Sequence, residues 1–312
     1  MSYGLDLLKI RENSKILLPE IICDVAVKVF TKKNLKIQFY KLNKNFEPNW
    51  SQLENLNCKN VSAILMVHFF GYPQNFTKFL NFTKRKKIFL IEDNCHSLPI
   101  KYRNRVLGKI GDIGIDSPRK IINELYSGGR LFVNFNQKLN KIKLDYFELK
   151  KKDIIKKKLK ENFKTIYSIY KFKGNRPNFE SPYLYSDQDN DFKVKKIDKK
   201  SLNMIKKINF KHEVIQRKNI YLKIDRFVKS NNMKPIFKLK KNIIPMYYVA
   251  QTRNLKHTKK IFDWGWKNKI QIVSWPSFYK KFKISKELKS RWEKYICIPL
   301  NQQFPKKYGK RI

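Results

Sequence analysis

The sequence predicts an α/β fold: a mostly parallel sheet flanked by helices, followed by a smaller C-terminal α+β domain. The first observation is that short apolar segments alternate with amphipathic segments over the first 135 residues, which is typical of a parallel sheet with crossover helices. The second is the apolar run VSAILMV at 61–67, the pattern of a strand buried on both faces. The third is size, because 312 residues suffice for a large and a small domain.

The elements of the first half follow from hydrophobic periodicity. Apolar runs or alternating segments predict strands at 16–18, 35–42, 61–67, 88–91, 112–116 and 131–134. Apolar residues at helical spacing predict helices at 4–14, 20–32 and 76–86. Strand, helix and strand follow one another at the short intervals that favour a parallel sheet.

The second half begins with a lysine-rich amphipathic region at 137–173, followed by a polar segment that contains Gly174, Pro177 and Pro182. Glycine and proline in a polar run indicate a connector. The predicted division is therefore a large domain at 1–175, a connector at 176–200 and a small domain at 201–312. The small domain is expected to contain helices at 201–228, 254–266 and 285–295 and strands at 243–249, 270–273 and 296–298.

The formal net charge is +45, while 42% of the residues are hydrophobic. So large a positive charge suggests an anionic partner such as nucleic acid, an anionic surface or a phosphorylated small molecule. The favoured interpretation is compositional, since Lys, Asn, Ile and Phe, which have A/T-rich codons, are all abundant. No basic-aromatic motif or zinc-finger spacing indicates specific nucleic-acid binding; a basic nucleic-acid-binding protein stays a lesser alternative.

Cysteine spacing, early charges and the length of the longest uncharged run indicate in which compartment the protein is expected. The four cysteines are far apart and show no CxxC spacing, so free thiols in a reducing compartment are expected. Charges appear too early in the first fifteen residues for a signal peptide. The longest uncharged run, 60–77, is too short to cross a bilayer. A soluble cytoplasmic protein without a membrane partner is the expectation.

The stretch 88–129 contains the candidate chemistry. A strand ends on Glu92-Asp93, and Lys120 lies on a later loop. An enzyme that uses pyridoxal 5'-phosphate (PLP) needs a lysine to form a Schiff base and an acid to keep the pyridine nitrogen protonated. Other interpretations are that Asp93 caps a turn and that Lys120 is a solvated cation. A metal site is disfavoured, because the adjacent Cys95 and His96 would not readily share one tetrahedral ion.

Six segments resemble, in order, the DegT/DnrJ/StrS family of PLP-dependent sugar aminotransferases, which have fold type I. Three of them are VHFFGYPQNF at 67–76, IEDNCHSL at 91–98 and GKIGDIGIDSPRKIINELYSGGRLFVN at 108–134. The other three are LLPEIICDVAVKVF at 17–30, VSWP at 273–276 and ICIPLNQQF at 296–304. The lysine segment is similar to a divergent branch of the family with a short lysine loop.

The resemblance implies roles for individual residues. Lys120 corresponds to the Schiff-base lysine, Asp93 to the partner of the pyridine nitrogen, and His96 to a side chain against the ring or its 3-hydroxyl. The helix start formed by Gly4, Leu5 and Asp6 corresponds to the phosphate-binding amides. Ser117 corresponds to a second phosphate contact. The implied substrate is a nucleotide-linked keto-sugar for polysaccharide or glycan synthesis, with glutamate as amino donor and a homodimer as the assembly.

Three positions depart from the family's pattern. Only Met1, Ser2 and Tyr3 precede the phosphate-binding helix start, so the resemblance is to an N-terminally truncated member. Leu5 replaces the usual Ser or Thr, and Ile21-Ile22-Cys23 replaces an aromatic residue that stacks on the cofactor. A truncated, catalytically impaired pseudoenzyme of the same fold is therefore the alternative hypothesis. PLP-dependent dehydration is also open, although the presence of Lys120 favours transamination.

Overall fold

The computed structural model describes residues 1–122, 124–135, 197–268, 270–274, 278–279 and 281–300, and the single positions 152, 155 and 159. Apart from those three positions, the predicted amphipathic region at 137–173 lies outside the described residues, as do most of the predicted connector and the Trp275-Pro276 pair. The proposed domain boundaries stay a prediction.

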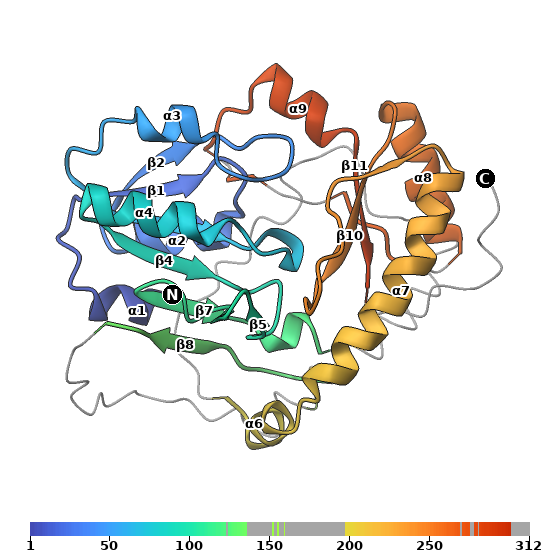
Figure 1. Cartoon of the computed structure of the whole chain (residues 1–312), viewed down its shortest axis with the longest axis horizontal. Helices are drawn as coiled ribbons and strands as arrows, with labels where there is room; N and C mark the ends of the chain where they lie inside the picture. The colour runs from blue at the N-terminus through green and yellow to red at the C-terminus, as the bar shows by residue number, and fades with distance from the viewer. Residues whose placement is uncertain are drawn as a thin grey trace.

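A six-stranded sheet forms the centre of the N-terminal half, in the order β2-β1-β3-β4-β7-β8 (Figure 1). Its strands are β1 (Lys15–Pro19), β2 (Lys36–Tyr40), β3 (Val61–Val67), β4 (Phe89–Asp93), β7 (Ile113–Asp116) and β8 (Arg130–Val133). The first five strands pair in parallel, and β8 pairs antiparallel with β7. The predicted mostly parallel sheet is confirmed.

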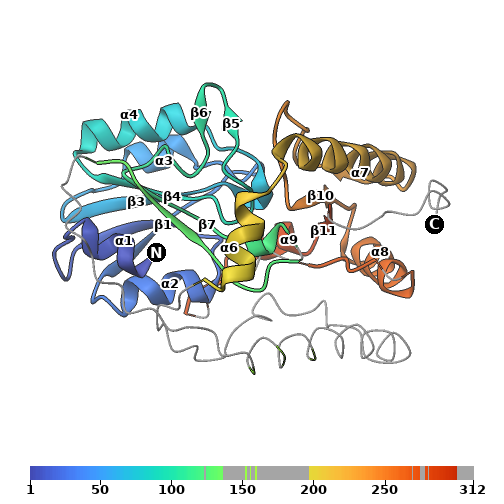
Figure 2. The same cartoon turned by 90° about the horizontal axis from the view of Figure 1, so that it is seen from below.

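Helices cover both faces of this sheet. α3 (Trp50–Glu54) and α4 (Phe76–Lys86) lie on one face, and α1 (Ser2–Leu7) and α2 (Asp24–Thr31) lie on the other (Figure 2). A hairpin of β5 (Lys101–Tyr102) and β6 (Arg105–Val106) projects on the side of α4. Two short 3-10 helices, η1 (Phe69–Gly71) and η2 (Pro118–Lys120), follow β3 and β7.

α4 illustrates how local sequence fixes an element. The Asn75 side chain accepts a hydrogen bond from the backbone N–H of Lys78 and so caps the first turn. Phe76, Phe79 and Phe82 fall at helical spacing and are buried. The helix ends where Lys87 adopts a left-handed conformation with φ of 54°. The predicted bounds 76–86 are confirmed.

The C-terminal half has a three-stranded antiparallel sheet in the order β11-β10-β9. Its strands are β9 (Lys234–Pro235), β10 (Tyr247–Gln251) and β11 (Tyr295–Pro299). Its helices are α6 (Lys199–Lys206), α7 (Phe210–Ser230), α8 (Leu255–Lys267) and α9 (Lys286–Trp292). In Figure 1, α7 runs from beside α6 along the small sheet. The smaller α+β unit is thus present.

The apolar core continues from the large sheet into the small one. Phe46 lies fully buried, with ring centroids 5.7 Å from Phe237 and 5.4 Å from Tyr295. Phe70, which follows β3, lies 5.8 Å from the same Phe237 ring. Because aromatic contacts of this kind bury much apolar area, the two sheets are packed against each other through the residues that follow the strands of the large sheet.

Several predicted boundaries are wrong in detail. The helix predicted at 4–14 is confined to Ser2–Leu7, and the one predicted at 201–228 is two helices, since α6 ends at Lys206 and Asn209 caps a new helix. The strand predicted at 270–273 forms only an isolated bridge between Val273 and Cys297. The short elements α3, β5, β6 and β9 were not predicted, because they are too brief to show periodicity.

Candidate active site

Strand register brings three chain segments to one edge of the large sheet. Val67, the last residue of β3, pairs with Asp93, the last residue of β4, and Asp93 pairs with Ile115 near the end of β7. Since these strands are parallel, their carboxyl ends meet at the same edge, where open α/β sheets bind ligands. The segments that follow the three strands carry His68, His96 and Lys120.

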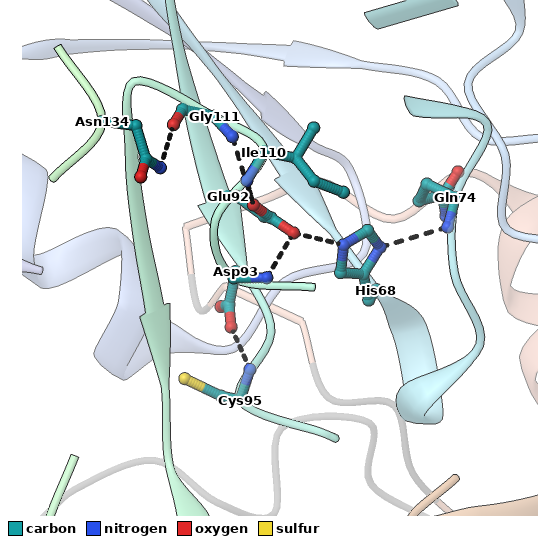
Figure 3. A network of polar contacts seen from close by, with 9 residues as sticks. His68, Gln74, Glu92, Asp93, Cys95, Ile110, Gly111 and Asn134 are labelled. Carbon is teal, nitrogen blue, oxygen red and sulfur yellow. Dashed lines mark hydrogen bonds and ion pairs between the residues drawn. The ribbon is translucent and has the colours of Figure 1, made fainter. Parts of the chain in front are cut away.

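Glu92 and Asp93 are neighbours in sequence, but they have different surroundings. Glu92 is fully buried, and its Oε1 accepts hydrogen bonds from the backbone N–H of Gly108 (2.6 Å) and from His68 Nε2 (2.8 Å). Its Oε2 accepts from the backbone N–H groups of Ile110 (2.6 Å) and Gly111 (3.2 Å). Figure 3 shows this network, in which both oxygens of the Glu92 carboxylate accept hydrogen bonds from within the protein. Glu92 therefore holds the fold rather than a ligand.

His68 completes that network through a defined tautomer. Its Nδ1 accepts a hydrogen bond of 3.1 Å from the backbone N–H of Gln74, so that nitrogen carries no proton. Nε2 therefore bears the proton and donates it to Glu92. His68 is fully buried, and both of its ring nitrogens are used by internal contacts, so its role is structural.

Asp93 is the acid that remains at the strand end. Its Oδ1 accepts a hydrogen bond of 2.8 Å from the backbone N–H of Cys95, as Figure 3 shows. The side chain is half-buried, and the Cys95 thiol also hydrogen-bonds to this carboxylate. Asp93 thus caps a turn and, unlike Glu92, keeps part of its carboxylate exposed at the strand end.

Lys120 ends η2 and is half-buried, whereas the adjacent Arg119 is exposed. The backbone N–H of Lys120 donates to the carbonyl of Ser117 at 2.9 Å, and the N–H of Ile121 donates to the carbonyl of Pro118. This single turn is rigid because Pro118 has a fixed φ and a carbonyl that also accepts from Ile122. The lysine side chain therefore leaves a short, well-bonded turn at the sheet edge.

His96 is buried and neutral. Burial, reinforced by the charge of Lys120, lowers the pKa of His96 to about 3. Its Nδ1 accepts a hydrogen bond of 3.3 Å from the backbone N–H of Phe70, so the proton of the neutral ring is on Nε2. His96 thus presents an N–H donor, and the charges of both Lys120 and Asp93 act on it.

The same two charges reach two thiols. Burial raises the pKa of Cys23, and the charge of Lys120 opposes that shift while Asp93 adds to it. Burial likewise raises the pKa of Cys95 well above its usual value, with the same two opposing influences from Asp93 and Lys120. Electrostatic effects of this size fall off with distance. Lys120, Asp93 and His96, from segments far apart in sequence, therefore share one neighbourhood.

The predicted phosphate-binding residues lie around this neighbourhood in different ways. Ser117 is buried at the start of η2. Gly4 packs so closely on the sheet that a Cβ there would lie 2.7 Å from the Ile113 side chain. Leu5 is buried in the core, and the exposed Asp6 side chain pairs with Lys33. The start of α1 lies near Asp93, whose charge acts on the Met1 amine, and the phosphate roles of Gly4, Leu5, Asp6 and Ser117 stay predictions.

The segment that departs from the family pattern is buried rather than open to a ligand. Ile21 is 1% and Ile22 is 6% exposed, and both belong to the large core. Cys23 is half-buried, occupies the N-cap position of α2 without a side-chain capping bond, and is the member of this segment on whose pKa Lys120 acts. No aromatic side chain is therefore offered from residues 21–23.

Gly71 belongs to the site, although its motif alone predicts no separate role for it. Its φ is +88°, and a Cβ there would lie 2.4 Å from the carbonyl oxygen of His96 and 2.8 Å from the Cα of Pro245. Only glycine combines that conformation with that approach. A G-x-P segment after a strand was the available signal, but nothing in the sequence showed that residues 244–245 are its neighbours.

The site's donor set fits PLP at the ring end. A half-buried carboxylate, a half-buried lysine and a neutral imidazole N–H lie together at a strand edge, which matches the needs of a protonated pyridine ring, its aldehyde and its hydroxyl. Within the described ranges, no three His, Cys, Asp or Glu side chains are grouped to hold a metal ion. Nor does any helix in the described part of the chain have the length and apolar character needed to cross a membrane.

Buried, neutral His96 predicts a pH effect on stability. Its pKa is about 3 in the folded chain against an ordinary 6.5, so the unfolded chain binds the extra proton and stability falls as pH drops below 6.5. At pH 5 this contribution amounts to a loss of about 2 kcal/mol. We measure the free energy of unfolding with urea at several pH values between 5 and 6.5. The slope of its dependence on pH should be smaller by about one bound proton in His96→Asn than in the wild type. The Asn Oδ1 can still accept the hydrogen bond from the Phe70 backbone.

The matched control is His212→Asn, because His212 is exposed. Its slope should equal that of the wild type. Equal slopes for wild type and His96→Asn would show that His96 is not held neutral in the folded chain.

Comparisons with known proteins address the first half and the fold separately. The model of the DegT/DnrJ/EryC1/StrS aminotransferase family matches residues 1–162. A UDP-4-amino-4,6-dideoxy-N-acetyl-beta-L-altrosamine transaminase of Campylobacter jejuni is 30% identical over 129 residues, covering 40% of this chain and 33% of that protein. A GDP-4-keto-6-deoxy-D-mannose 3-dehydratase of Yersinia pseudotuberculosis is 23% identical over 107 residues, covering 34% and 27%. The chain thus spans about a third or less of the length of the curated relatives it matches.

Solved structures resemble the whole chain. The PLP form of Spr1654 from Streptococcus pneumoniae superposes with a TM-score of 0.69 at 14% identity, covering 99% of this chain and 81% of that one. PseC of Helicobacter pylori, an aminotransferase involved in the biosynthesis of pseudoaminic acid, gives 0.65 at 15% identity, covering 99% and 82%. These likenesses show the fold, that of the fold type I PLP-dependent aminotransferases.

Proposed function

The chain belongs to the DegT/DnrJ/EryC1/StrS aminotransferase family, and from that premise we propose that it is a PLP-dependent aminotransferase acting on a nucleotide-linked keto-sugar. The observation that carries the proposal is the convergence of Lys120 and Asp93 on His96, on whose pKa both charges act, at the carboxyl edge of three parallel strands. PLP is the cofactor of the family.

The cofactor would supply an electron sink for the bonds at the substrate carbon. Asp93 would hold the pyridine nitrogen with its half-buried carboxylate, whose Oδ1 also accepts from the backbone of Cys95. His96 would donate its Nε2 proton toward the ring hydroxyl, since its Nδ1 is committed to Phe70. Lys120 would bind the cofactor covalently, and its freed Nζ is the group placed to move a proton at the substrate carbon.

The remaining parts of the proposal come from the family. We take glutamate as the amino donor, a homodimer as the assembly, and surface polysaccharide or another glycan as the destination of the amino sugar. The similarity of this chain to the Campylobacter jejuni transaminase supports a nucleotide-sugar substrate. The dehydratase similarity supports the same substrate class with a different outcome, and Lys120 favours transamination between the two.

A catalytically impaired member of the family is the second candidate. It is favoured by one observation: Ile21 and Ile22 are buried in the core, so residues 21–23 offer no aromatic ring to stack on the cofactor. Stacking aromatics contribute on the order of 0.5–1.5 kcal/mol beyond area burial, so their absence would weaken cofactor binding about two- to tenfold. Ketone-to-amine turnover by the purified chain would exclude this candidate.

The test of the proposal is covalent trapping. The purified chain is incubated with PLP, reduced with borohydride and digested, and the modified peptide is identified by mass spectrometry. We expect a single stoichiometric adduct on Lys120. Absence of an adduct at saturating PLP would reject the enzyme proposal, and an adduct spread over many surface lysines would count as nonspecific amine chemistry.

Asp93→Asn tests the acid. The Asn Oδ1 can still accept from Cys95, so the turn should survive and the midpoint of thermal unfolding should stay within about 2 °C, since changes that keep contacts cost under about 0.5 kcal/mol. The charge on the pyridine nitrogen is lost, and we expect turnover to fall about 10²–10³-fold. Steady-state kinetics with glutamate and the keto-sugar would measure the loss.

Asp112→Asn is the matched control. Asp112 Oδ2 also accepts one backbone N–H, that of Leu90 at 2.7 Å, but the residue stands at the opposite end of β7 from Lys120. Its turnover should equal that of the wild type. Equal losses in the two variants would mean that Asp93 acts through the turn and not through its charge.

A further inference from the structure

The lysine loop is held from outside the large sheet by one buried arginine. Arg217 lies in α7 and is 3% exposed. One terminal nitrogen donates to the carbonyl of Ile121 at 2.7 Å, and the other donates to the carbonyl of Pro245 at 3.0 Å. Its Nε lies 3.4 Å from the Glu213 carboxylate one helical turn earlier. A buried guanidinium of this kind fixes geometry because its donors form a rigid planar fork.

Both carbonyls belong to segments that border the candidate site. Ile121 directly follows Lys120, and its own side chain is buried in a small cluster with Leu98 and Ile244. Pro245 lies against the Gly71 backbone, where a Cβ on Gly71 would meet the Pro245 Cα at 2.8 Å. Arg217 thus connects the segment carrying the lysine to the segment that packs on Gly71 and, through it, on His96.

A second contact holds the other end of the same loop. The hydroxyl of Ser201 in α6 accepts from the backbone N–H groups of Tyr126 (3.1 Å) and Ser127 (3.3 Å). The carboxylate of Asp198 accepts from the Ser127 hydroxyl at 2.6 Å. With both ends of the loop tied to α6 and α7, the direction of the Lys120 side chain depends on the C-terminal half of the chain.

We propose that Arg217 is a positioning residue for Lys120, which sets the orientation of the lysine turn from α7 through the Ile121 carbonyl. The inference rests on the proposed function, because it assigns Arg217 a part in cofactor capture at Lys120. Misplacing a reacting group by about 1 Å costs on the order of 10²-fold in rate, and truncating Arg217 leaves two buried carbonyls without their donors.

The experiment compares four full-length proteins: wild type, Arg217→Met, Arg217→Lys and Arg291→Met. Arg291 is the matched control, since from α9 it also donates to two carbonyls, those of Leu42 (3.0 Å) and Asn43 (2.7 Å), away from the lysine loop. Two quantities are measured: hydrogen exchange of peptides covering residues 118–127 without cofactor, and the pH-dependent rate of borohydride-fixed PLP uptake on Lys120.

Relative to the wild type, we expect Arg217→Met to show faster hydrogen exchange in residues 118–127 and a smaller change elsewhere. We also expect it to take up PLP about 10²-fold more slowly. Its pH profile should shift, since the lysine amine meets a changed environment. Arg217→Lys can reach only one carbonyl and should be intermediate. Arg291→Met should match the wild type in both quantities even where its thermal midpoint is lowered. If Arg291→Met changed hydrogen exchange in 118–127 and the rate of PLP uptake as much as Arg217→Met does, Arg217 would contribute only general stability. That result would overturn the inference.

Two further outcomes separate this inference from the proposed function. A wild type that takes up PLP on Lys120, beside a folded Arg217→Met that does so at the same rate, rejects the inference alone. A wild type that takes up no PLP rejects the proposed function and this inference with it. If Arg217→Met does not fold, Arg217→Lys decides: unchanged exchange and unchanged uptake overturn the inference.

Discussion

Replacing Lys120 by alanine is expected to abolish the fixable PLP adduct and to lower turnover by on the order of 10³-fold or more, because the variant loses both the covalent attachment and the proton-transferring amine. The fold should be unaffected. Lys120 is half-buried, and its backbone bonds within η2 do not involve the side chain, so the free energy of unfolding should change by no more than about 0.5 kcal/mol. Mass spectrometry after borohydride reduction, together with thermal unfolding, measures both quantities.

The chain's 70 lysines and arginines make controls essential for this experiment. Lys109→Ala is the matched one, because Lys109 belongs to the same motif but places its ammonium 5.5 Å from the centre of the Phe132 ring. Lys109→Ala should keep the adduct in full. Lys120→Arg preserves the charge but cannot form the imine and should behave like Lys120→Ala. An adduct that persists in Lys120→Ala would transfer the role to another lysine.

Much of the architecture around Lys120 could be predicted because it is local. The runs at 61–67 and 88–91 are apolar strands in any context, and a parallel sheet brings the residues after them to one edge. The positions of Asp93 and Lys120 within their motifs then predict that they meet. In the structure, the charges of both residues act on the pKa of His96, while their roles in catalysis stay predictions.

The supporting contacts could not be predicted, since they join residues that no local pattern relates. Arg217 stands 96 positions from Ile121 in the sequence. In a chain so rich in cations, nothing in the sequence distinguishes Arg217 from an arginine on the solvated face of α7. Gly71 fits beside Pro245 only because β10 returns to the large sheet, where the N–H of Met246 donates to Phe70. Burial of a polar group becomes visible only when the tertiary structure shows its partners.

Glu92 is the plainest case of a residue whose role needed the structure. In sequence, Glu92 and Asp93 form an undifferentiated pair of carboxylates at a strand end. In the fold, strand alternation points them to opposite sides, and Glu92 meets the loop 108–111 as that loop closes over the sheet. The chain thus uses one acid of the pair to build the loop that precedes β7 and leaves the other for chemistry.

Glu92→Gln is therefore expected to destabilise the chain by about 3–5 kcal/mol, the cost of breaking a buried charged hydrogen-bond network on one side. The amide NH₂ cannot accept, so at least one of the backbone donors at Gly108, Ile110 and Gly111, or His68 Nε2, is left facing another donor. For a chain of this size the midpoint of thermal unfolding should fall by roughly 10 °C. Urea and thermal unfolding would measure the change, together with hydrogen exchange of residues 108–111.

Glu54→Gln separates this effect from the general loss of a carboxylate. Glu54 forms a surface ion pair with Arg85, with side chains 39% and 56% exposed, and such pairs contribute about 1 kcal/mol at most. A Glu92→Gln variant as mildly affected as Glu54→Gln would mean that water or local rearrangement satisfies the loop's amides. The loop would then not depend on Glu92, and the division of labour between the two strand-end acids would have to be abandoned.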